Sequence, residues 1–374
     1  MRDQLVNYKS LVIRVLEALK QASKDLQIDL HNNTPTKSSS ATAAASADCD
    51  SPSVNALLEL ETESDDLFSG DPKLSPLSRH LSRLKSLIED LRLHRHDLLL
   101  RRRRQISRVA GSIESEIQAW IDRESLGGLV HALRNHDDDD PSAAIDLLSA
   151  LQHRLSRGGF DRDLQDLVLD AGVLPAVDSV VRDARAPVRV REACAEAVAA
   201  LVRFNKDVFL VPPMGPTARA LVSMASARAL AALTSLIVSV KSPLVDEIRS
   251  NGDVAKIVGL LGPGEDLEIR ARASECVMEM GYYGRKEAVE AMMGAGVVER
   301  MVGMERGGDG GFGGCVGRFA VQLEVGEGLR GKERRAFKVE ILRAVREAVS
   351  TDDEDDQALC ATIIAEVLWG STPY

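Results

Sequence analysis

Apolar residues recur three and four positions apart in a series of related segments in the C-terminal two thirds of the chain. This spacing places them on one side of an α-helix and gives each helix a buried stripe. Small residues, mostly alanine, occupy fixed places and let neighbouring helices approach closely. The segments are Ala144–Leu151, Cys194–Leu201, Ala229–Leu236 and Ala273–Met280. The pattern predicts an all-α structure built from similar helices.

The spacing of the glycines indicates the same repeat independently. Gly128, Gly172, Gly215, Gly252 and Gly296 follow one another at intervals of 44, 43, 37 and 44 residues, and each opens a short apolar run. A helical period near 40–47 residues is typical of armadillo and HEAT solenoids. One such unit cannot bury its own hydrophobic face, so the units must stack. Stacked repeats bind other macromolecules along an extended concave surface.

Residues 252–298 carry the clearest copy of the repeat. A glycine-led second helix is followed by the turn Gly262–Asp266, a third helix that begins near Glu268, and a next first helix from Arg285. On these residues the chain resembles armadillo repeat proteins. The style is similar to plant armadillo proteins, including the repeat portion of plant U-box ubiquitin ligases. The resemblance covers residues 125–374 and implies an armadillo-like, right-handed superhelical solenoid.

Two departures from family patterns narrow the expected function. In importin-α-like repeats, an asparagine one residue before the last leucine of the binding helix clamps a peptide backbone. The matching residues here are Ala150, Ala200, Ser235 and Glu279, so we do not expect carriage of classical nuclear signals. A U-box would show a Cys-Pro-Ile start, a Pro-Val pair and a Thr-Tyr-x-Arg stretch before the repeats, and the sequence contains none of these.

The N-terminal third has a different organisation. Residues 1–31 form one amphipathic helix, with apolar positions from Leu5 to Leu26. Residues 32–72 are rich in Ser and Ala and then acidic, which is typical of a flexible linker. Residues 73–124 return to a heptad-like pattern that predicts helices able to pair in a coiled-coil-like bundle. The armadillo-like repeats then occupy residues 125–374.

Composition limits the classes of function. Apolar residues make up 44 % of the 374 residues and aromatic residues only 3 %, which suits an all-helical protein. A net charge of −10 argues against general nucleic-acid binding. The cysteines, which form no Cys-x-x-Cys pair, indicate reduced and mostly buried thiols. They are Cys49, Cys194, Cys276, Cys315 and Cys360.

The sequence gives no sign of membrane targeting. Charged residues interrupt the first apolar stretch, so we expect no signal peptide. No run approaches 18 apolar residues, so we expect no transmembrane segment. Together with the cysteine pattern, these features predict a cytoplasmic or nuclear protein, or one found in both places.

Several local features have a more and a less specific interpretation. Arg101, Arg102, Arg103 and Arg104 form either a localisation signal or acidic-lipid contact, or else a solvated helix face beside the acidic linker. The acidic runs 137–140 and 352–356 lack the ligand spacing of calcium loops, and both precede a predicted third helix. We expect them to complement the N-termini of those helices.

Two further motifs do not fit the sites that they suggest. Residues 308–313 match a G-x-G-x-x-G string, but a helical segment rather than a strand precedes them, so a flexible inter-helix turn is favoured over a phosphate loop. His94 and His96 have no third ligand at zinc spacing. We therefore expect no cofactor, no metal site and no catalytic residues.

The candidate binding surface is the concave row of third helices. Its exposed positions are taken from residues that lie between the apolar ones. Charged side chains of both signs dominate, and Tyr282, Tyr283 and Phe204 are aromatic anchors of the kind that supply most binding energy. The candidates are Arg191, Glu192, Glu196, Arg203, Asn205, Arg270, Arg272, Glu275, Glu279, Tyr282 and Tyr283.

These observations predict a non-catalytic scaffold or adaptor that binds a partner protein along the concave face. Two alternatives remain open at this point. The first is a component that assists protein ubiquitination without a U-box, and the second is a transport or membrane adaptor that uses Arg101–Arg104. We expect protein partners rather than a small-molecule substrate.

Overall fold

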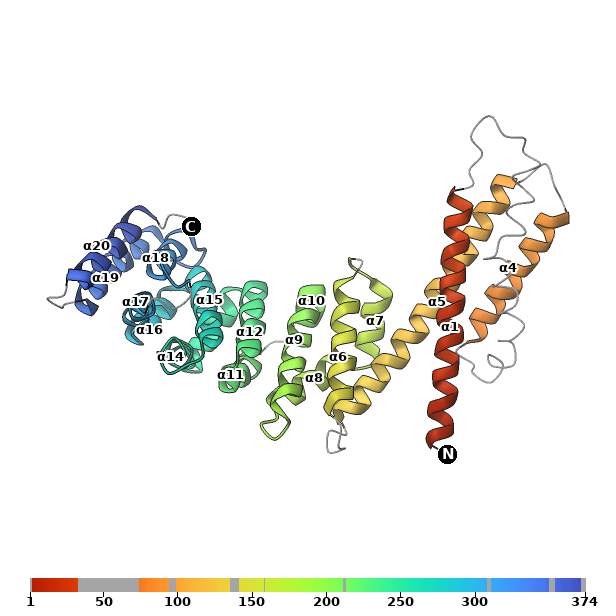
Figure 1. Cartoon of the computed structure of the whole chain (residues 1–374), viewed down its shortest axis with the longest axis horizontal. Helices are drawn as coiled ribbons and strands as arrows, with labels where there is room; N and C mark the ends of the chain where they lie inside the picture. Colours follow the sequence, from red (N-terminus) through yellow and green to blue (C-terminus); the bar gives the residue numbers. More distant parts are fainter. Residues whose placement is uncertain are drawn as a thin grey trace. The chain divides into compact units, whose positions relative to one another are not determined.

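The chain is described by a computed structural model that covers residues 2–32, 74–93, 99–134, 141–157, 159–210, 213–307, 311–349 and 354–370. The described residues form helices and connecting turns, without a β-strand (Figure 1). Two compact units are distinguished. Unit 1 comprises residues 1–127 and 162–167, and unit 2 comprises residues 128–161 and 168–374.

Three long helices of unit 1 share one hydrophobic core. They are α1 (Arg2–Asn32), α4 (Ser75–Leu93) and α5 (Leu99–Arg134). Most apolar positions of the predicted pattern whose side chains are described lie in this core, and Val15 is partly buried against it. Leu16, Leu74 and Ala110 also belong to the core, although the sequence pattern did not include them. The buried residues are Val12, Leu16, Leu19, Ala22, Leu26, Leu74, Leu77, Leu81, Leu84, Ile88, Ile106, Val109, Ala110, Ile113, Ile117 and Trp120. The expected linker, residues 32–72, lies outside the described residues apart from Asn32.

Unit 2 repeats a set of short first and second helices followed by a third helix. After α6 (Pro141–Ser156), complete sets follow one another along the chain, beginning with α7, of which residues 162–167 belong to unit 1. They are α7 (Arg162–Asp170), α8 (Val173–Arg182) and α9 (Val188–Phe204); α10 (Lys206–Phe209), α11 (Gly215–Met224) and α12 (Ala227–Val240); α13 (Ser242–Ser250), α14 (Val254–Gly259) and α15 (Leu267–Tyr283); and α16 (Lys286–Gly294), α17 (Val297–Arg306) and α18 (Cys315–Val325). Two helices, α19 (Gly331–Ala348) and α20 (Glu354–Trp369), end the series.

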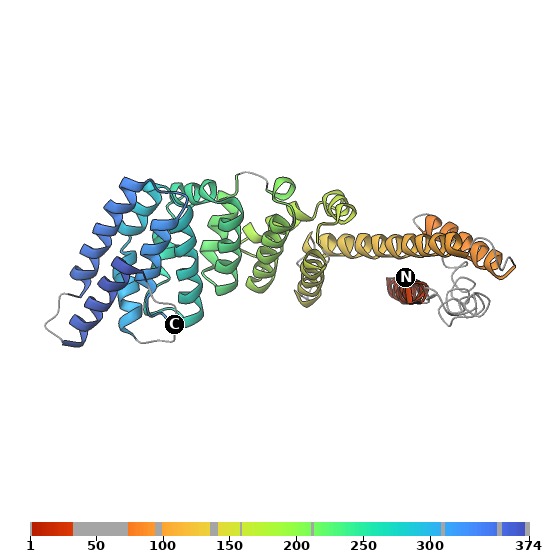
Figure 2. The same cartoon turned by 90° about the horizontal axis from the view of Figure 1, so that it is seen from above.

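The third helices pack against one another in sequence order. Each contacts the next, from α6 to α9, α12, α15, α18 and finally α20 (Figure 2). Helices of the other rows join neighbouring repeats as well, in the pairs α8–α11, α11–α13, α14–α16 and α17–α19. Each repeat is therefore covered by the next one, and the predicted all-α repeat solenoid is confirmed.

Alanine allows this close stacking. Five alanines of α9 are buried while the helix contacts α6, α8 and α12. They are Ala193, Ala195, Ala197, Ala199 and Ala200. Side chains this small leave room for helices on several sides, and the larger Val198 and Leu201 fill the layer between them.

The regularly spaced glycines of the repeats do not all occupy the same kind of position in the structure. Gly172, Gly252 and Gly296 adopt positive φ angles of 66°, 76° and 78°, a conformation that glycine adopts without the steric cost of a side chain. Each lies in the turn between a first and a second helix. Gly215 instead is the first residue of α11.

Gly128 does not begin a helix, which corrects the expectation from its spacing. It lies inside α5, which continues without interruption from Leu99 to Arg134. Glycine costs a helix about 1 kcal/mol relative to alanine. The buried Leu126, Leu129, Val130 and Leu133 on both sides of it offset this cost. The predicted boundary between residues 124 and 125 therefore falls within one helix.

Candidate protein-binding face and its pocket

One side of the third helices is open in every complete repeat of unit 2. We call it the third-helix face, and its residues are Glu192 and Glu196 on α9, Arg228 on α12, Glu268, Arg272, Glu275, Met278, Glu279 and Tyr282 on α15, and Arg318, Val321 and Gln322 on α18. In each helix these positions lie opposite the buried stripe. Most are charged, and both signs are present.

Two of the predicted surface residues are buried instead. Arg191 is 8 % exposed and Arg270 is 6 % exposed. Both precede the first small residue of the buried stripe by three positions, and three residues turn a helix through about 300°, which returns them close to the buried side. The prediction that these two arginines contribute exposed positions is therefore wrong.

The buried arginines have structural contacts. Arg191 donates hydrogen bonds from Nε and Nη2 to the carbonyl oxygen of Val181, at 3.2 and 3.1 Å. Val181 belongs to the last turn of α8, where a cation is favoured by the helix dipole. The guanidinium of Arg270 lies 5.3 Å from the ring centroid of Phe312, a cation–π contact between α15 and the turn before α18.

Two predicted residues of α9, Glu192 and Glu196, contact Arg228, which the sequence analysis did not include among the candidates. The guanidinium of Arg228 on α12 binds the carboxylate of Glu196 through two hydrogen bonds and lies 3.9 Å from Glu192. The hydrogen bond to Glu196 is the main reason that the pKa of Arg228 is raised. Arg228 precedes Ala229 in the repeated helix segment, the same place that Arg272 occupies before Ala273, so alignment of the repeats could have found it.

Arg203 and Asn205, the remaining candidates at the end of α9, differ in their surroundings. Arg203 is exposed. Asn205 accepts a hydrogen bond from the backbone N–H of Asp207 at 3.1 Å and so caps the short helix α10. Phe204 packs its ring against Phe160 and Phe209, with centroid separations of 5.6 and 6.4 Å.

The predicted residues of α15 other than Arg270 are exposed or half-buried. Arg272 pairs with Glu275 at 2.9 Å within the helix. Glu279 is half-buried, and burial raises the pKa of its carboxyl group. The rings of Tyr282 and Tyr283 meet edge to face at 4.8 Å. Lys241 lies 5.5 Å from the Tyr283 ring centroid and also pairs with Glu327 at 3.0 Å, so these tyrosines belong to a contact between repeats.

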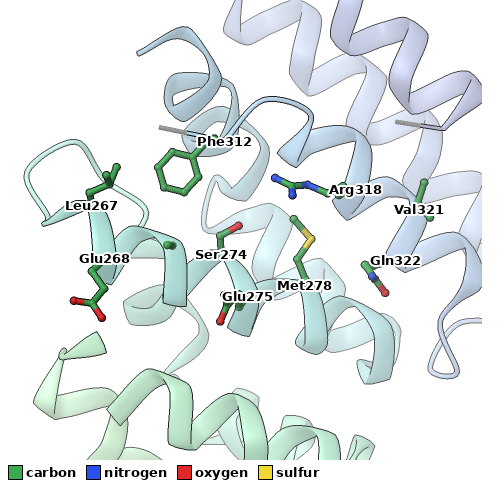
Figure 3. Close-up of a pocket in the computed structure, with 11 residues that line it drawn as sticks. Leu267, Glu268, Ser274, Glu275, Met278, Phe312, Arg318, Val321 and Gln322 are labelled. Carbon is green, nitrogen blue, oxygen red and sulfur yellow. The ribbon is translucent and has the colours of Figure 1, made fainter. Parts of the chain in front are cut away.

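A pocket of about 620 Å³ opens between α15 and α18 on the third-helix face (Figure 3). Phe312, in the turn between α17 and α18, stands at one end, and Met278 and Val321 contribute further apolar surface. Phe312 comes from the glycine-rich segment 308–313 that the sequence analysis predicts as an inter-helix turn. Residues 311–314 do form such a turn, and residues 308–310 lie outside the described part of the chain.

Three buried thiols of unit 2, those of Cys194, Cys276 and Cys315, are unsuited to nucleophilic chemistry. Burial raises the pKa of Cys194 and of Cys276 to about 12, and burial raises the pKa of Cys315 as well. These groups stay protonated at neutral pH, and the thiolate is the nucleophilic form. Cys49 lies outside the described residues.

The acidic run before α20 agrees with the expected helix-terminus role. Glu354, Asp355 and Asp356 lie in the first turn of α20, and Asp356 pairs with Arg306 at 2.9 Å. Residues 137–140 lie outside the described part. Within the described residues, no group of three or more His, Cys, Asp or Glu side chains is placed to hold a metal ion, and no helix has the length and hydrophobicity of a membrane span.

The predicted arginine cluster lies at the start of α5. Arg101, Arg102, Arg103 and Arg104 follow Leu99 and Leu100 in this helix, and the side chain of Arg104 is exposed. The side chains of the first three lie outside the described part. Neither interpretation of the cluster gains support from this placement.

Known proteins give limited comparisons. No protein-family model matches the chain, and no curated protein matches it. Among solved structures, a designed armadillo repeat protein is 16 % identical, with a TM-score of 0.43 over 65 % of this chain and 99 % of that chain. Computationally designed armadillo repeat proteins for modular peptide recognition give 16 %, 0.43, 64 % and 99 % for the same four quantities. Because these TM-scores are below 0.5, the repeat organisation of this chain is inferred from its own helices and their packing.

Proposed function

We propose that the chain is a non-catalytic scaffold or adaptor that binds a partner protein along the third-helix face. The observation that carries this proposal is the continuity of that face, since α9, α12, α15 and α18 pack in order and all present open side chains. Its charged groups and its pocket lie on the same side of the repeats, as a surface for a long partner segment requires.

We also propose that the protein acts in the cytoplasm, the nucleus or both. The ubiquitination-linked and transport alternatives receive no support from the described residues.

Affinity capture with the full-length chain tests the proposal. The parent is compared with a face variant that combines Glu196→Arg, Glu275→Arg and Arg318→Glu. A matched control combines Glu287→Arg, Glu290→Arg and Arg249→Glu on the exposed surface of first helices α16 and α13. Both variants change the net charge equally, and circular dichroism checks their helicity.

Mass spectrometry then identifies the proteins captured from a native lysate. We expect at least one protein that the parent and the control retain and the face variant loses. Partners that all three chains retain equally would contradict the proposal and direct attention to unit 1.

A further inference from the structure

We propose that the pocket between α15 and α18 binds one large apolar side chain of an extended peptide segment, with a lysine or arginine beside it that pairs with Glu268. This inference rests on the proposed function and names the place on the third-helix face where the partner is anchored.

The lining of the pocket suits an apolar anchor. Leu267, Met278, Phe312 and Val321 supply the apolar surface, and Ala271 and Ser274 leave space between them. A volume of about 620 Å³ is within the range of pockets that bind ligands. Leu267 is a large apolar side chain that is half exposed at the start of α15, where it gains contacts when a partner side chain enters.

The charged residues around the pocket favour a particular kind of residue beside the apolar anchor of the partner peptide. Within the described residues, the exposed carboxylate of Glu268 makes no ion pair, whereas Glu275 is paired with Arg272. Arg318, the basic residue of the lining, is also exposed, and it interacts electrostatically with the carboxylates of Glu305 and Glu366. Among the described residues of the lining, two carboxylates and one guanidinium give a net negative charge, and a cation on the partner that pairs with Glu268 complements it.

The usual spacing of packed helices suits an extended segment. Packed helices lie about 8–10 Å apart, and an extended chain advances about 3.3 Å per residue. About three residues therefore pass each third helix, and one side chain points into the furrow between α15 and α18. Gln322 on the α18 wall carries an amide that can both donate and accept hydrogen bonds with a peptide backbone.

The probe is a phage-displayed library of random peptides, selected on the immobilised full-length chain. We expect enrichment of peptides with a large apolar residue next to Lys or Arg. A selected peptide is then synthesised with a fluorescent label, and its affinity is measured by fluorescence anisotropy. A second copy with benzoylphenylalanine at the apolar position is photo-crosslinked, and we expect attachment within residues 267–278 or 311–322.

Two variants test the pocket directly. Ala271→Trp fills it and should weaken binding by about tenfold or more, whereas Ala336→Trp on the exposed surface of α19 should change nothing. Glu268→Lys should weaken binding about threefold. When the basic residue of the peptide is replaced by Glu, its binding to the Glu268→Lys variant should recover the lost affinity. A general effect of the substitution on folding would not produce this rescue.

Several results would overturn the inference. They are enriched peptides without the apolar–basic pair, crosslinks outside the two segments, absence of charge rescue, or no enrichment at all. If selected peptides ignore Ala271→Trp and Glu268→Lys but lose binding to the face variant, the pocket inference fails while the proposed function stands.

Discussion

The guanidinium of Arg228 and the carboxylate of Glu196 form a two-point contact between consecutive third helices, with Nε 2.7 Å from Oε1 and Nη2 2.8 Å from Oε2. The two residues are 32 positions apart in the sequence and belong to α12 and α9. This contact joins two consecutive repeats on the open face. It also means that these charges are partly satisfied before any partner arrives.

A double-mutant cycle with Glu196→Gln and Arg228→Gln should give a coupling energy of about 0.5–1 kcal/mol, because the pair is two-point but partly exposed. Urea unfolding at low and high salt measures it, and the coupling should shrink at high salt. The exchanged pair, Glu196→Arg with Arg228→Glu, should recover part of the loss. Equal stability of all four proteins would show that the contact contributes nothing.

The burial of Arg191 predicts a stability role. Replacing it by methionine keeps an apolar stem but leaves the Val181 carbonyl oxygen without its charged donor. We expect a loss of about 1–3 kcal/mol in the free energy of unfolding. Arg189→Met, at an exposed position of the same helix, should change stability by less than about 0.5 kcal/mol. Chemical unfolding compares the two, and similar values would contradict the assigned contact.

Gly328 lies where two backbone segments meet. Its N–H and that of Glu327 donate to the carbonyl oxygen of Tyr282, at 3.2 and 2.8 Å. A Cβ atom at Gly328 would lie 2.0 Å from the carbonyl oxygen of Gly284, so the backbone must shift. Gly328→Ala should therefore lower stability by about 2 kcal/mol or more.

Gly303 provides the matched control for this substitution. It lies inside α17, and a Cβ atom there meets nothing within 4 Å. Gly303→Ala should raise stability by about 0.5–1 kcal/mol, since alanine favours helix. Thermal unfolding followed by circular dichroism measures both changes, and the prediction requires them to have opposite signs.

The carboxyl group of Glu366 makes stability depend on pH. Burial raises its pKa, with a further contribution from Glu305, while Arg318 acts in the opposite direction. Its Oε2 is buried without a hydrogen-bond partner among the described residues. The folded state therefore favours the protonated form, so the stabilising contribution is present at acidic pH and is lost as the pH rises through the raised pKa.

Glu366→Gln should consequently stabilise the protein at pH 7, on the order of 1 kcal/mol. The stability advantage should disappear below pH 4.5, the ordinary pKa of a glutamate, where the side chain of the parent protein is also neutral. Denaturant unfolding at several pH values measures the difference, with Glu354→Gln at the exposed start of α20 as the control. An advantage that is independent of pH would rule out this electrostatic origin.

The third helices show how far sequence patterns reach and where they stop. Their apolar positions were predictable, because residues three and four apart share one side of a helix whatever surrounds it. The side occupied by Arg191 and Arg270 was not, since it depends on how the helix rotates against its neighbours. Alternation with apolar residues suggested exposure, while packing against α8 and Phe312 buried both side chains.

The sequence by itself determined the all-α class, the helical repeat and the glycines that precede apolar runs at Gly172, Gly252 and Gly296, because these follow from local periodicity. Only the tertiary structure decided that α5 continues through Gly128, that Arg228 joins Glu196, and that Phe312 helps to line a pocket. Those relationships depend on side chains brought together from helices and turns distant in sequence, and their geometry is set by packing rather than by local spacing.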